Sequence, residues 1–520
     1  MKKEVYVRKA SGLIRNISAL DAMVFNLMVM APTAVLVYGI WASEIWPGVH
    51  LPTTVLICIP LCVVVGLFYA LYSAAMPRSG GDYVWISRTL HPVLGFMSTF
   101  WLFICVLSVA GAYIPWFTQW ALAPILEVNG YTEAAAVVST DWFSFLFAVI
   151  WYLICAFLIS RGGKVTSRVL EIFFAAVMVG LVVYVVTLVT GGTAQFAANF
   201  NAMTSMDYEG VIQTAVDAGF PGKFLMTATL LGFSFTLINF LGFHCSIYAS
   251  GEIKEVHKSQ FIAIVGAVII FGLISWIAYE ASYVGMGGEF VGALSYLAAT
   301  GHPYYTLPFA EPFFLPFLYQ YAVSSPIYTI VICCWSAMIL GAILTYIAVG
   351  VRLVFAWSFD RVLPTALSNV DRRYGSPYMA LIFVTIVAII LQAAWIWTPL
   401  LGYFAYIVMG WMLVQAICAI SGLIFPYVKK DIYEKTPAIV RAKIGPVPWL
   451  SILAVITLLI SVYIGYASML PAMVGTVDPS ILAFTFGIFA LGAVIYYISA
   501  IYHKKAGIPL DLVFKEIPPE

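Results

Sequence analysis

Charged side chains are scarce in this sequence, and their scarcity indicates the solvent in which the chain folds. Only 9% of the 520 residues are Asp, Glu, Lys or Arg, while 63% are hydrophobic. Soluble globular domains carry about 25% charged residues. The formal net charge is +1, which gives no electrostatic reason to expect a nucleic acid as partner. The composition predicts an all-α polytopic membrane protein, because long apolar segments cross a bilayer as helices.

The sequence also lacks the patterns of common membrane enzymes. Its eight cysteines lie inside apolar runs, without the exposed, regular spacing of a disulfide or zinc framework. Five of the six histidines lie in loops or near helix ends, so no ligand set for haem or another metal converges within the apolar runs. No Gly-x-x-x-x-Gly-Lys phosphate loop is present. We therefore expect no catalytic residues, no metal centre, no cofactor and no ATP-driven pump.

Long apolar runs are what the sequence has in abundance. A helix that spans the bilayer needs about 20 predominantly apolar residues. Twelve segments meet this requirement, at residues 20–42, 51–76, 92–122, 141–160, 169–190, 224–249, 260–286, 327–357, 378–398, 400–426, 447–473 and 481–502.

The basic residues sort between the two faces of this arrangement. If the N-terminus is cytoplasmic, 24 of the 25 Lys and Arg residues fall on the cytoplasmic side, and only Lys223 falls outside. One miscounted helix would scramble this sorting, so helix count and orientation support each other. The basic N-terminal segment has no short apolar stretch followed by a cleavage site, so we expect no removable signal peptide. We expect a multi-pass protein of the cytoplasmic membrane with both termini inside.

Loops and helix-breaking residues indicate two repeats of five helices. The cytoplasmic loop 77–91 follows the second helix, and the outward loop 287–326 follows the seventh, as repeats of inverted topology require. Each repeat opens with a helix that carries a breaker near its middle, namely Pro32 in VMAPTAVL and Gly242 in NFLGFHC. Freed backbone groups survive at membrane depth only when buried in protein or lining a cavity. The paired breaks therefore predict a central polar site.

This reading divides the chain into seven parts. They are a cytoplasmic N-terminal segment (1–19), the first repeat (20–190), an extracytoplasmic loop (191–223), the second repeat (224–428), a cytoplasmic loop (429–446), helices eleven and twelve (447–502) and a cytoplasmic tail (503–520). Helices eleven and twelve are extra to the two repeats.

Four segments resemble the amino acid permeases of the amino acid–polyamine–organocation superfamily. That family's loop between helices two and three resembles YALYSAAMPRSGGDYVWISRTLHPVLGFM (69–97). Its stretch after helix eight resembles RLVFAWSFDRVLPTALSNVDRRYGSPY (352–378), and its broken sixth helix resembles LGFHCSIYASGEIKEVHKS (241–259). Its first helix is similar to LIRNISALDAMVFN (13–26). The resemblance implies the five-plus-five inverted-repeat fold with two extra helices, and uptake or exchange of amino acids by alternating access.

The resemblance also implies which residues line the site. The family's Gly-x-Gly at the break of helix one falls on Pro32, Thr33 and Ala34, so the amides of Thr33 and Ala34 would take over the binding of a substrate carboxylate. A substrate-contacting aromatic residue of helix eight falls on Tyr346. The residues expected at the substrate are Met30, Ala31, Thr33, Ala34, Ile238, Asn239, Leu241, Gly242 and Tyr346.

Three further residues are expected to couple or gate transport. His244 is the histidine placed at mid-membrane, and an ordinary imidazole pKa of about 6.5 suits proton coupling. Thr345 would instead help to hold Na⁺ beside the freed carbonyls of helix one, and obligate exchange needs neither residue. Glu171, close to Arg168, is either a structural ion pair or a cytoplasmic gate, and Asp21 is either a helix cap or a gate.

The substrate class stays open. Because the Gly-x-Gly anion cradle is missing, polyamines, other organic cations and nucleobase-like solutes are alternatives to amino acids. A non-transporting sensor of the same fold would have the same sequence pattern. The lysine that some proton-coupled relatives carry in helix five falls on Val177 or Met178, so that mechanism does not carry over. The expected partners are the lipid bilayer and a small solute, with the protein a monomer or a homodimer.

Overall fold

The computed structural model describes residues 12–32, 34, 36, 42–43, 45–309, 315–371, 373–398, 407–469, 479–506 and 510–515. Within these residues, 11 helical segments are long and apolar enough to cross a membrane, and Ala19–Met30 forms a shorter apolar helix. Each of them overlaps one of the twelve predicted segments, and parts of the predicted segments 20–42, 400–426 and 447–473 lie outside the described residues.

The spanning helices follow the order expected of two repeats and two extra helices. The first repeat contains α1 (Ala19–Met30), α3 (Leu51–Ala75), α5 (Pro92–Phe117), α8 (Asp141–Ser160) and α9 (Gly163–Met203). The second contains α11 (Met226–Thr236) with η3 (Leu237–Phe240) and η4 (Cys245–Glu252), then α12 (Val256–Ser282), α15 (Ser325–Phe359), α16 (Tyr378–Trp397) and α17 (Ile407–Val428). The extra helices are α19 (Trp449–Ala467) and α21 (Pro479–Lys505).

Shorter elements lie between these helices and at their ends. They are α4 (Asp82–Thr89), η2 (Thr118–Leu122), α6 (Ala123–Val128), α7 (Thr132–Val138), α10 (Tyr208–Asp217), η5 (Tyr283–Gly287), α13 (Gly288–Ala299), α14 (Leu315–Tyr319), η6 (Thr365–Ser368), α18 (Lys430–Tyr433) and η8 (Leu510–Lys515). A small antiparallel hairpin joins β1 (Lys443–Ile444) to β2 (Val447–Pro448), with Lys443 opposite Pro448.

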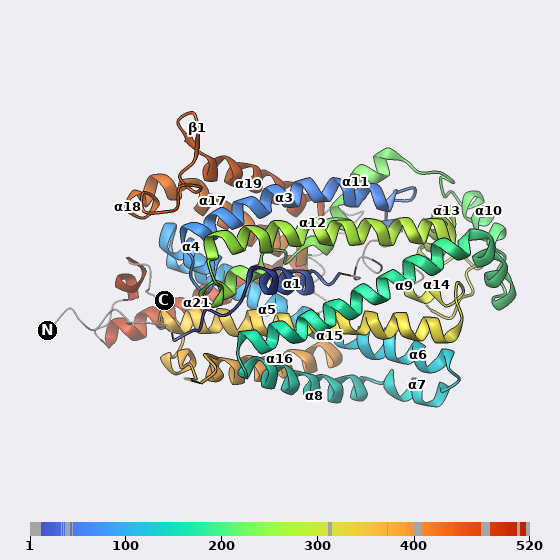
Figure 1. The fold of residues 1–520 in the computed structure, drawn as a ribbon, viewed down its shortest axis with the longest axis horizontal. Coiled ribbons are helices and arrows are strands. Elements are labelled where there is room, and N and C mark those ends of the chain that lie inside the picture. Colours follow the sequence, from blue (N-terminus) through green and yellow to red (C-terminus); the bar gives the residue numbers. More distant parts are fainter. Residues whose placement is uncertain are drawn as a thin grey trace.

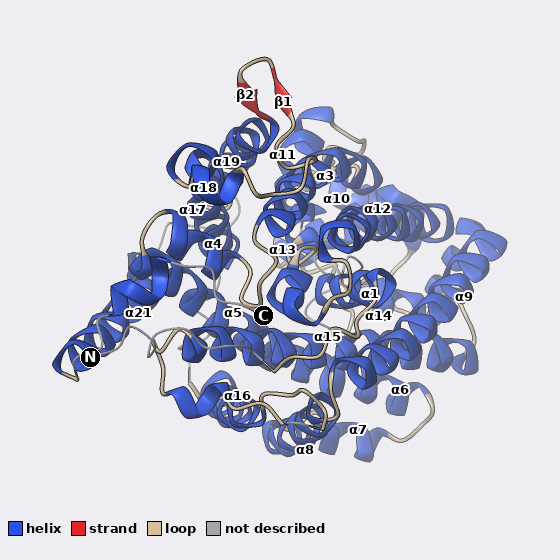
Figure 2. Ribbon diagram, turned by 60° about the vertical axis from the view of Figure 1, so that its left-hand side comes forward, coloured by secondary structure: helices blue, strands red, loops and turns tan. Residues whose placement is uncertain are grey.

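Helices at equivalent places in the two repeats pack against each other. α3 packs on α12, α5 on α15 and α8 on α16. Each broken helix packs on the second helix of the other repeat, because α1 packs on α12 and α11 packs on α3. This reciprocal packing is what a pseudo-two-fold axis in the membrane plane produces. Figure 2 shows α1, α5 and α15 in the interior, with α8 and α16 along one side.

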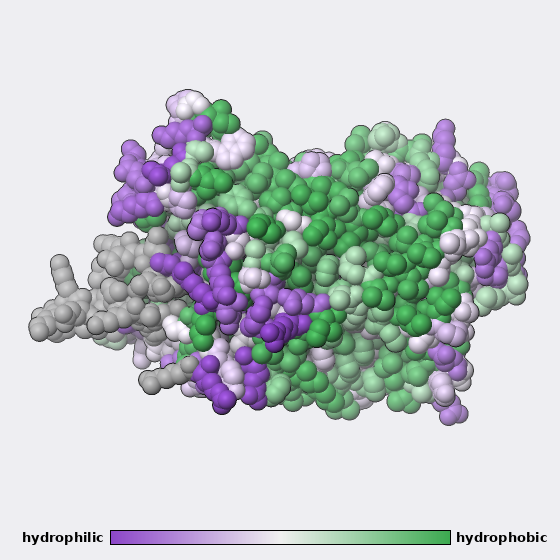
Figure 3. All heavy atoms as spheres, in the orientation of Figure 1, coloured by the Kyte–Doolittle hydropathy of each residue, from purple (hydrophilic) through white to green (hydrophobic). Residues whose placement is uncertain are grey.

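The surface is divided into a broad apolar belt and two polar ends (Figure 3). Large apolar side chains are exposed along the outer helices, such as Leu153, Val182, Ile386, Leu459 and Ile498. Such a belt matches the hydrocarbon layer of a bilayer. Figure 1 shows α4, α18 and β1 at one end of the molecule and α6, α10 and α13 at the other. We call the first of these the basic end, because its loops carry residues such as Arg15, Arg161, Lys435 and Arg441.

Helix boundaries differ from the predicted spans mainly outside the apolar belt. α9 begins at Gly163 and continues to Met203, although Gly192, with φ 69° and ψ 172°, divides it into two helical parts. The predicted loop 191–223 therefore contains the second part of α9 and all of α10. Hydropathy indicates where a helix leaves the hydrocarbon layer, but it does not indicate where the helix ends. The stretch after Gly192 contains several alanines, which favour helix.

Candidate functional site

The break in helix one is set by its proline. α1 begins with a capping box in which Ser18 and Asp21 each accept a backbone amide of the other. It ends at Met30, and Ala31 takes a left-handed conformation with φ 56°. The residue before a proline disfavours helical geometry, so Pro32 explains why the helix stops here. The break leaves the Val29 carbonyl free, and the Tyr346 hydroxyl of α15 donates to it at 2.9 Å.

The break in helix six lies against the break in helix one. After α11 the chain passes through the short helix η3, and Gly242 then adopts φ 93°. A side chain at Gly242 would overlap the side chain of Val29. Glycine is needed here both for its positive φ and for this close approach. The two breaks, more than 200 residues apart in sequence, thus form one site.

Two buried polar atoms at the break of helix six have no hydrogen-bond partner among the described residues. Asn239 donates its amide to the Thr236 carbonyl at 3.2 Å, while its Oδ1 is unpaired. His244 Nδ1 is also unpaired, and the ring is 2% exposed. Buried polar groups are nearly always satisfied by protein or by ordered water. These two atoms are therefore available to a bound solute or to water.

His244 is held in place by aromatic rings. It stacks on Tyr69 of α3, with ring centroids 3.9 Å apart and an angle of 14°. The rings of Phe243 and Trp411 meet it edge to face at 4.9 Å and 6.2 Å. Packing on three sides fixes the orientation of the imidazole beside the helix break.

A buried polar network ties helix one to helices six and seven. Asn26 accepts the Ser246 amide at 2.7 Å and donates to the Ser246 hydroxyl at 3.0 Å and to the Ala263 carbonyl at 3.1 Å. The Ser246 hydroxyl donates to Gln260 Oε1 at 2.7 Å, and Gln260 donates to the Ser250 hydroxyl at 3.2 Å. These side chains satisfy backbone and hydroxyl groups of the broken segment, as membrane burial requires.

An aromatic wall that sequence reasoning missed extends from Tyr346. The Tyr113 ring of α5 meets Tyr346 edge to face at 5.7 Å and stacks on Trp116 at 4.7 Å. Trp116 in turn stacks on Trp335 of α15 at 6.4 Å. The sequence does contain a cluster of aromatic residues around positions 113–120. Such a cluster is equally compatible with side chains that face lipid, so it did not identify the wall.

The other residues that were expected at the substrate differ in where the structure places them. Thr33 lies outside the described residues. Met30 and Ala31 are buried at the end of α1, and Ile238 and Leu241 are half-buried beside Asn239. The amide of Ala34 donates to the Ala31 carbonyl at 2.8 Å, so in this conformation it does not offer the free donor expected for a carboxylate.

The residues expected to couple or gate have partners that sequence alone did not identify. The Thr345 hydroxyl donates to the Ala342 carbonyl of its own helix at 2.7 Å. Glu171 lies near the carboxyl of Asp21 as well as near Lys164 and Arg168. Arg168 is one turn away along α9, but Asp21 reaches Glu171 from another helix. Val177 lines a small apolar cavity of about 20 Å³ together with Leu36 and Tyr184.

At the basic end the N-terminal segment is hydrogen-bonded to the end of helix six. The amides of Asn16 and Ile17 both donate to the Glu252 carbonyl at 3.0 Å, and the Lys254 amide donates to the Ile17 carbonyl at 2.9 Å. The Glu252 carboxylate is in turn paired with Arg352 of α15, through contacts of 2.8 Å and 3.0 Å. Helices one, six and eight are therefore joined at this end.

Helix five closes the same end from another side. Lys164 Nζ lies 2.9 Å and 2.7 Å from the two carboxylate oxygens of Asp21, so Asp21 is both a helix cap and an ion-pair partner. The space left between these helices is a cavity of about 10 Å³. It is lined by Ile17, Asp21, Ala22, Phe25, Gly163, Thr166, Ser167, Ser246, Ala249, Ile253 and Arg352. A cavity of this size holds no solute, so the described parts of these helices are packed closely together at the basic end.

The loop that carried the clearest family resemblance is attached to the same segment of helix six. The Gly80 amide donates to the Tyr248 carbonyl at 3.2 Å, and the Gly251 amide donates to the Ser79 hydroxyl at 3.2 Å. A side chain at Gly81 would lie 2.5 Å from Ile247. The glycines of this loop therefore allow its backbone to lie directly on η4.

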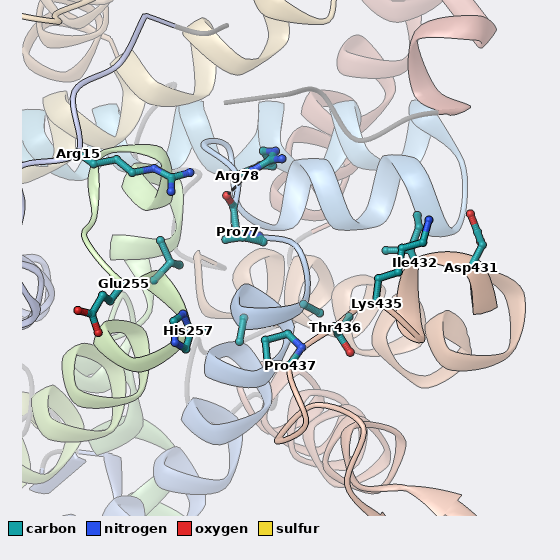
Figure 4. A pocket seen from close by; sticks show the side chains of 13 residues that line it. Arg15, Pro77, Arg78, Glu255, His257, Asp431, Ile432, Lys435, Thr436 and Pro437 are labelled. Atoms are coloured by element: carbon teal, nitrogen blue, oxygen red, sulfur yellow. Dashed lines mark hydrogen bonds between the residues drawn. The ribbon is translucent and has the colours of Figure 1, made fainter.

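A larger cavity of about 860 Å³ lies at the basic end, away from the helix breaks. Figure 4 shows the labelled side chains of Arg15, Arg78, Glu255, His257 and Lys435 around it. Its walls come from the ends of α3 and α12 and from the segment around α18, and α1, α11 and α15 contribute none of them. This cavity is separate from the candidate substrate site.

Comparison with known proteins agrees with this geometry. A methylthioribose transporter of Bacillus subtilis (strain 168) is 24% identical over 380 residues, which cover 71% of this chain and 73% of that protein. The glutamate/serine transporter AimA of the same organism is 20% identical over 395 residues, which cover 74% of this chain and 65% of that protein. The family model described as amino acid permease matches residues 17–491. The chain therefore belongs to the amino acid permease family, and it is a secondary transporter of amino acids or related solutes in a membrane, not an enzyme.

Proposed function

We propose that the transported solute is a small zwitterionic or neutral amino-acid-like molecule that binds between the breaks of helices one and six. The observation that carries this proposal is the pair of unpaired buried atoms, Asn239 Oδ1 and His244 Nδ1, beside the touching breaks. Asn239, His244 and Tyr346 bring no formal charge to the described part of the site when the imidazole is neutral. A solute with a large net charge would find no counter-charge among these three side chains, which favours one of low net charge.

The relatives suggest two substrate classes to compare. One is named for glutamate and serine, and the other for methylthioribose, an uncharged solute with a ring and a thioether. Serine fits the amino-acid proposal directly. The aromatic wall of Tyr113, Trp116 and Trp335 favours a second candidate, a solute with a flat or apolar portion, because such a portion can pack on aromatic rings.

We propose alternating access with the basic end in the cytoplasm and the protein in the cell membrane. The concentration of basic residues at that end supports this orientation. The clamp formed by Ile17, Glu252 and Arg352 would be the cytoplasmic gate in its closed state. His244 is the proposed proton-coupling group, because it is a titratable side chain with an unpaired nitrogen at the helix break.

Purified protein in liposomes tests the substrate proposal. A panel of serine, other neutral amino acids, glutamate, methylthioribose, polyamines and nucleobases should yield uptake or exchange for at least one low-charge solute. Asn239→Ala should reduce that flux at least tenfold, whereas Asn129→Ala, at an exposed position distant from the breaks, should leave it unchanged. Flux of polyamines alone would contradict the proposed substrate class, and binding without flux would identify a sensor.

A further inference from the structure

The carboxyl group of Asp82 is buried, and none of the described cationic side chains forms an ion pair with it. Asp82 is the first residue of α4, which follows the second spanning helix, and it is 1% exposed. The Tyr248 hydroxyl donates to its Oδ2 at 3.1 Å. Its Oδ1 has no partner among the described residues. Burial of an ionised carboxylate in such surroundings is strongly unfavourable unless it is paired.

The groups that face Asp82 supply no compensating charge. Arg88 of the same helix is engaged by Asp360, with Nη1 and Nη2 at 2.5 Å and 2.8 Å from the two carboxylate oxygens. The other titratable neighbours are Tyr83 of α4, Tyr248 and Cys245 of η4, Tyr69 of α3 and Cys418 of α17, all uncharged when protonated. Burial raises the pKa of the Asp82 carboxyl to about 7, although the hydrogen bond from Tyr248 lowers it.

Asp82 also lies on a contact with η4, the segment that is joined to the N-terminal segment and to α15 at the basic end. Its loop is attached to η4 through the Gly80 amide, the Ser79 hydroxyl and the Tyr248 hydroxyl. The same η4 segment ends at Glu252, whose carbonyl accepts the Ile17 amide and whose carboxylate is paired with Arg352. If η4 moves to open the basic end, Tyr248 leaves Asp82 and water reaches the carboxyl.

We propose that Asp82 is a proton-binding site whose occupancy is linked to closure of the basic end. The inference rests on the proposed alternating access. In the closed state the carboxyl holds a proton taken from water, with one O–H bond formed on the carboxyl. When the end opens, hydration favours the carboxylate, that O–H bond breaks and the proton returns to water at the same end. Low pH therefore favours the closed state.

Linkage gives the size of the effect. Protonation stabilises the closed state about elevenfold at one pH unit below the pKa of the closed form and about 1.1-fold at one unit above it. The ratio of open to closed protein should therefore rise about tenfold over these two pH units.

Cysteine accessibility measures this ratio without any knowledge of the solute. Ser167 lines the closed cavity of about 10 Å³, and Ser167→Cys changes one atom. The protein, in vesicles whose basic end faces the reagent, is labelled with an impermeant thiol reagent, and modification at position 167 is quantified by peptide mass spectrometry. The rate is divided at each pH by the rate for the same protein unfolded in detergent, so the ordinary rise in thiolate cancels.

The expected result is a normalised rate that rises about tenfold between about pH 6 and about pH 8. Asp82→Asn, which mimics the protonated form, should give a low rate that does not vary with pH. Tyr248→Phe removes a hydrogen bond that favours the carboxylate, so the midpoint should move to higher pH. Glu255→Gln, at an exposed carboxyl paired with Lys258, should leave the profile unchanged.

A pH profile that persists in Asp82→Asn, or a flat profile with Asp82 present, would overturn the proposal. If Asp82→Asn fails to give a monodisperse protein, the Tyr248→Phe midpoint decides, and a midpoint that does not move counts against the site. Absence of flux for every solute in the liposome panel would contradict the proposed function while leaving the labelling profile intact, so the two failures are distinguishable.

Discussion

At the residue scale, polar side chains buried at the helix breaks and at the basic end differ in whether they have a partner. Arg88 with Asp360 and Arg352 with Glu252 are buried ion pairs with two contacts each. Asn239 Oδ1, His244 Nδ1 and Asp82 Oδ1 have no hydrogen-bond partner in the described part of the chain. Paired groups join elements to one another, whereas unpaired groups are available to a solute or a proton, so this difference separates structural residues from candidate functional ones.

Removing one member of a buried ion pair should destabilise the protein strongly. In Asp360→Asn the Arg88 guanidinium keeps its charge but loses its counter-ion, with both side chains at most 3% exposed. The free energy of unfolding in detergent should fall by about 3–5 kcal/mol. Denaturant titration followed by intrinsic fluorescence measures the change.

The exposed pair of Lys258 and Glu255 provides the control, because Glu255→Gln should cost at most about 1 kcal/mol. Adding Arg88→Met to Asp360→Asn removes the uncompensated charge and should recover most of the loss. A double variant as unstable as Asp360→Asn would show that the buried charge is not the cause.

At the element scale, each broken helix is interrupted at one residue, and the two helices contact each other at these interruptions. Pro32 stops α1, and Gly242 allows the chain of helix six to turn against Val29. The half of helix six at the basic end is the short helix η4, which carries contacts to the N-terminal segment, α4 and α15. One element therefore connects the candidate substrate site to the basic end.

Gly242→Ala should cost more than backbone strain alone. Alanine at a positive φ costs about 1–2 kcal/mol, and at Gly242 the added methyl group also overlaps Val29. Gly445→Ala is the matched control, because Gly445 has φ 60° and nothing within 4 Å of an added methyl group. The variants are compared by unfolding in detergent and by flux of the best solute in liposomes.

The Gly242 variant should lose both stability and flux, and the Gly445 variant should lose only the backbone cost of about 1–2 kcal/mol of stability and no flux. Val29→Ala together with Gly242→Ala should restore part of the loss. Equal costs at the two glycines would mean that contact between the breaks does not matter.

At the scale of the whole molecule, the ends of the transporter differ in composition and in state. The basic end is closed by the clamp and by the ion pairs of Asp21 and Glu252. The apolar belt separates it from the opposite end (Figure 3). A closed end of this kind is one of the two states that alternating access requires.

Replacement of His244 should separate proton coupling from exchange. In liposomes with an acidic exterior and a neutral interior, uptake should rise with the pH gradient if His244 binds the coupled proton on the outward-open side. His244→Gln should lose this response and keep solute exchange, because glutamine fills a similar volume but does not titrate. If uptake by the wild-type protein depends on Na⁺ and not on pH, His244 is not the proton-coupling group and its role is to pack against Tyr69.

Much of the architecture was determined by the sequence itself. Hydropathy located the twelve spanning segments, because burial of apolar side chains in lipid depends only on local composition. Pro32 and Gly242 located the breaks, because backbone restrictions act within a few residues. The family-like loop 69–97 identified the fold class, but its composition did not indicate which residues its glycines would touch.

The partners of polar residues were decided only by the tertiary structure. Glu171 lies beside the carboxyl of Asp21, the Tyr346 hydroxyl donates to the carbonyl of Val29, and the Tyr248 hydroxyl donates to the carboxyl of Asp82. Each of these contacts joins residues 150 or more positions apart, whereas hydropathy and turn signals report on neighbours in the chain. The position of a charge in the sequence predicts the side of the membrane that it occupies. The packing of helices decides whether that charge has a partner, and a buried group without one is a candidate for a functional role.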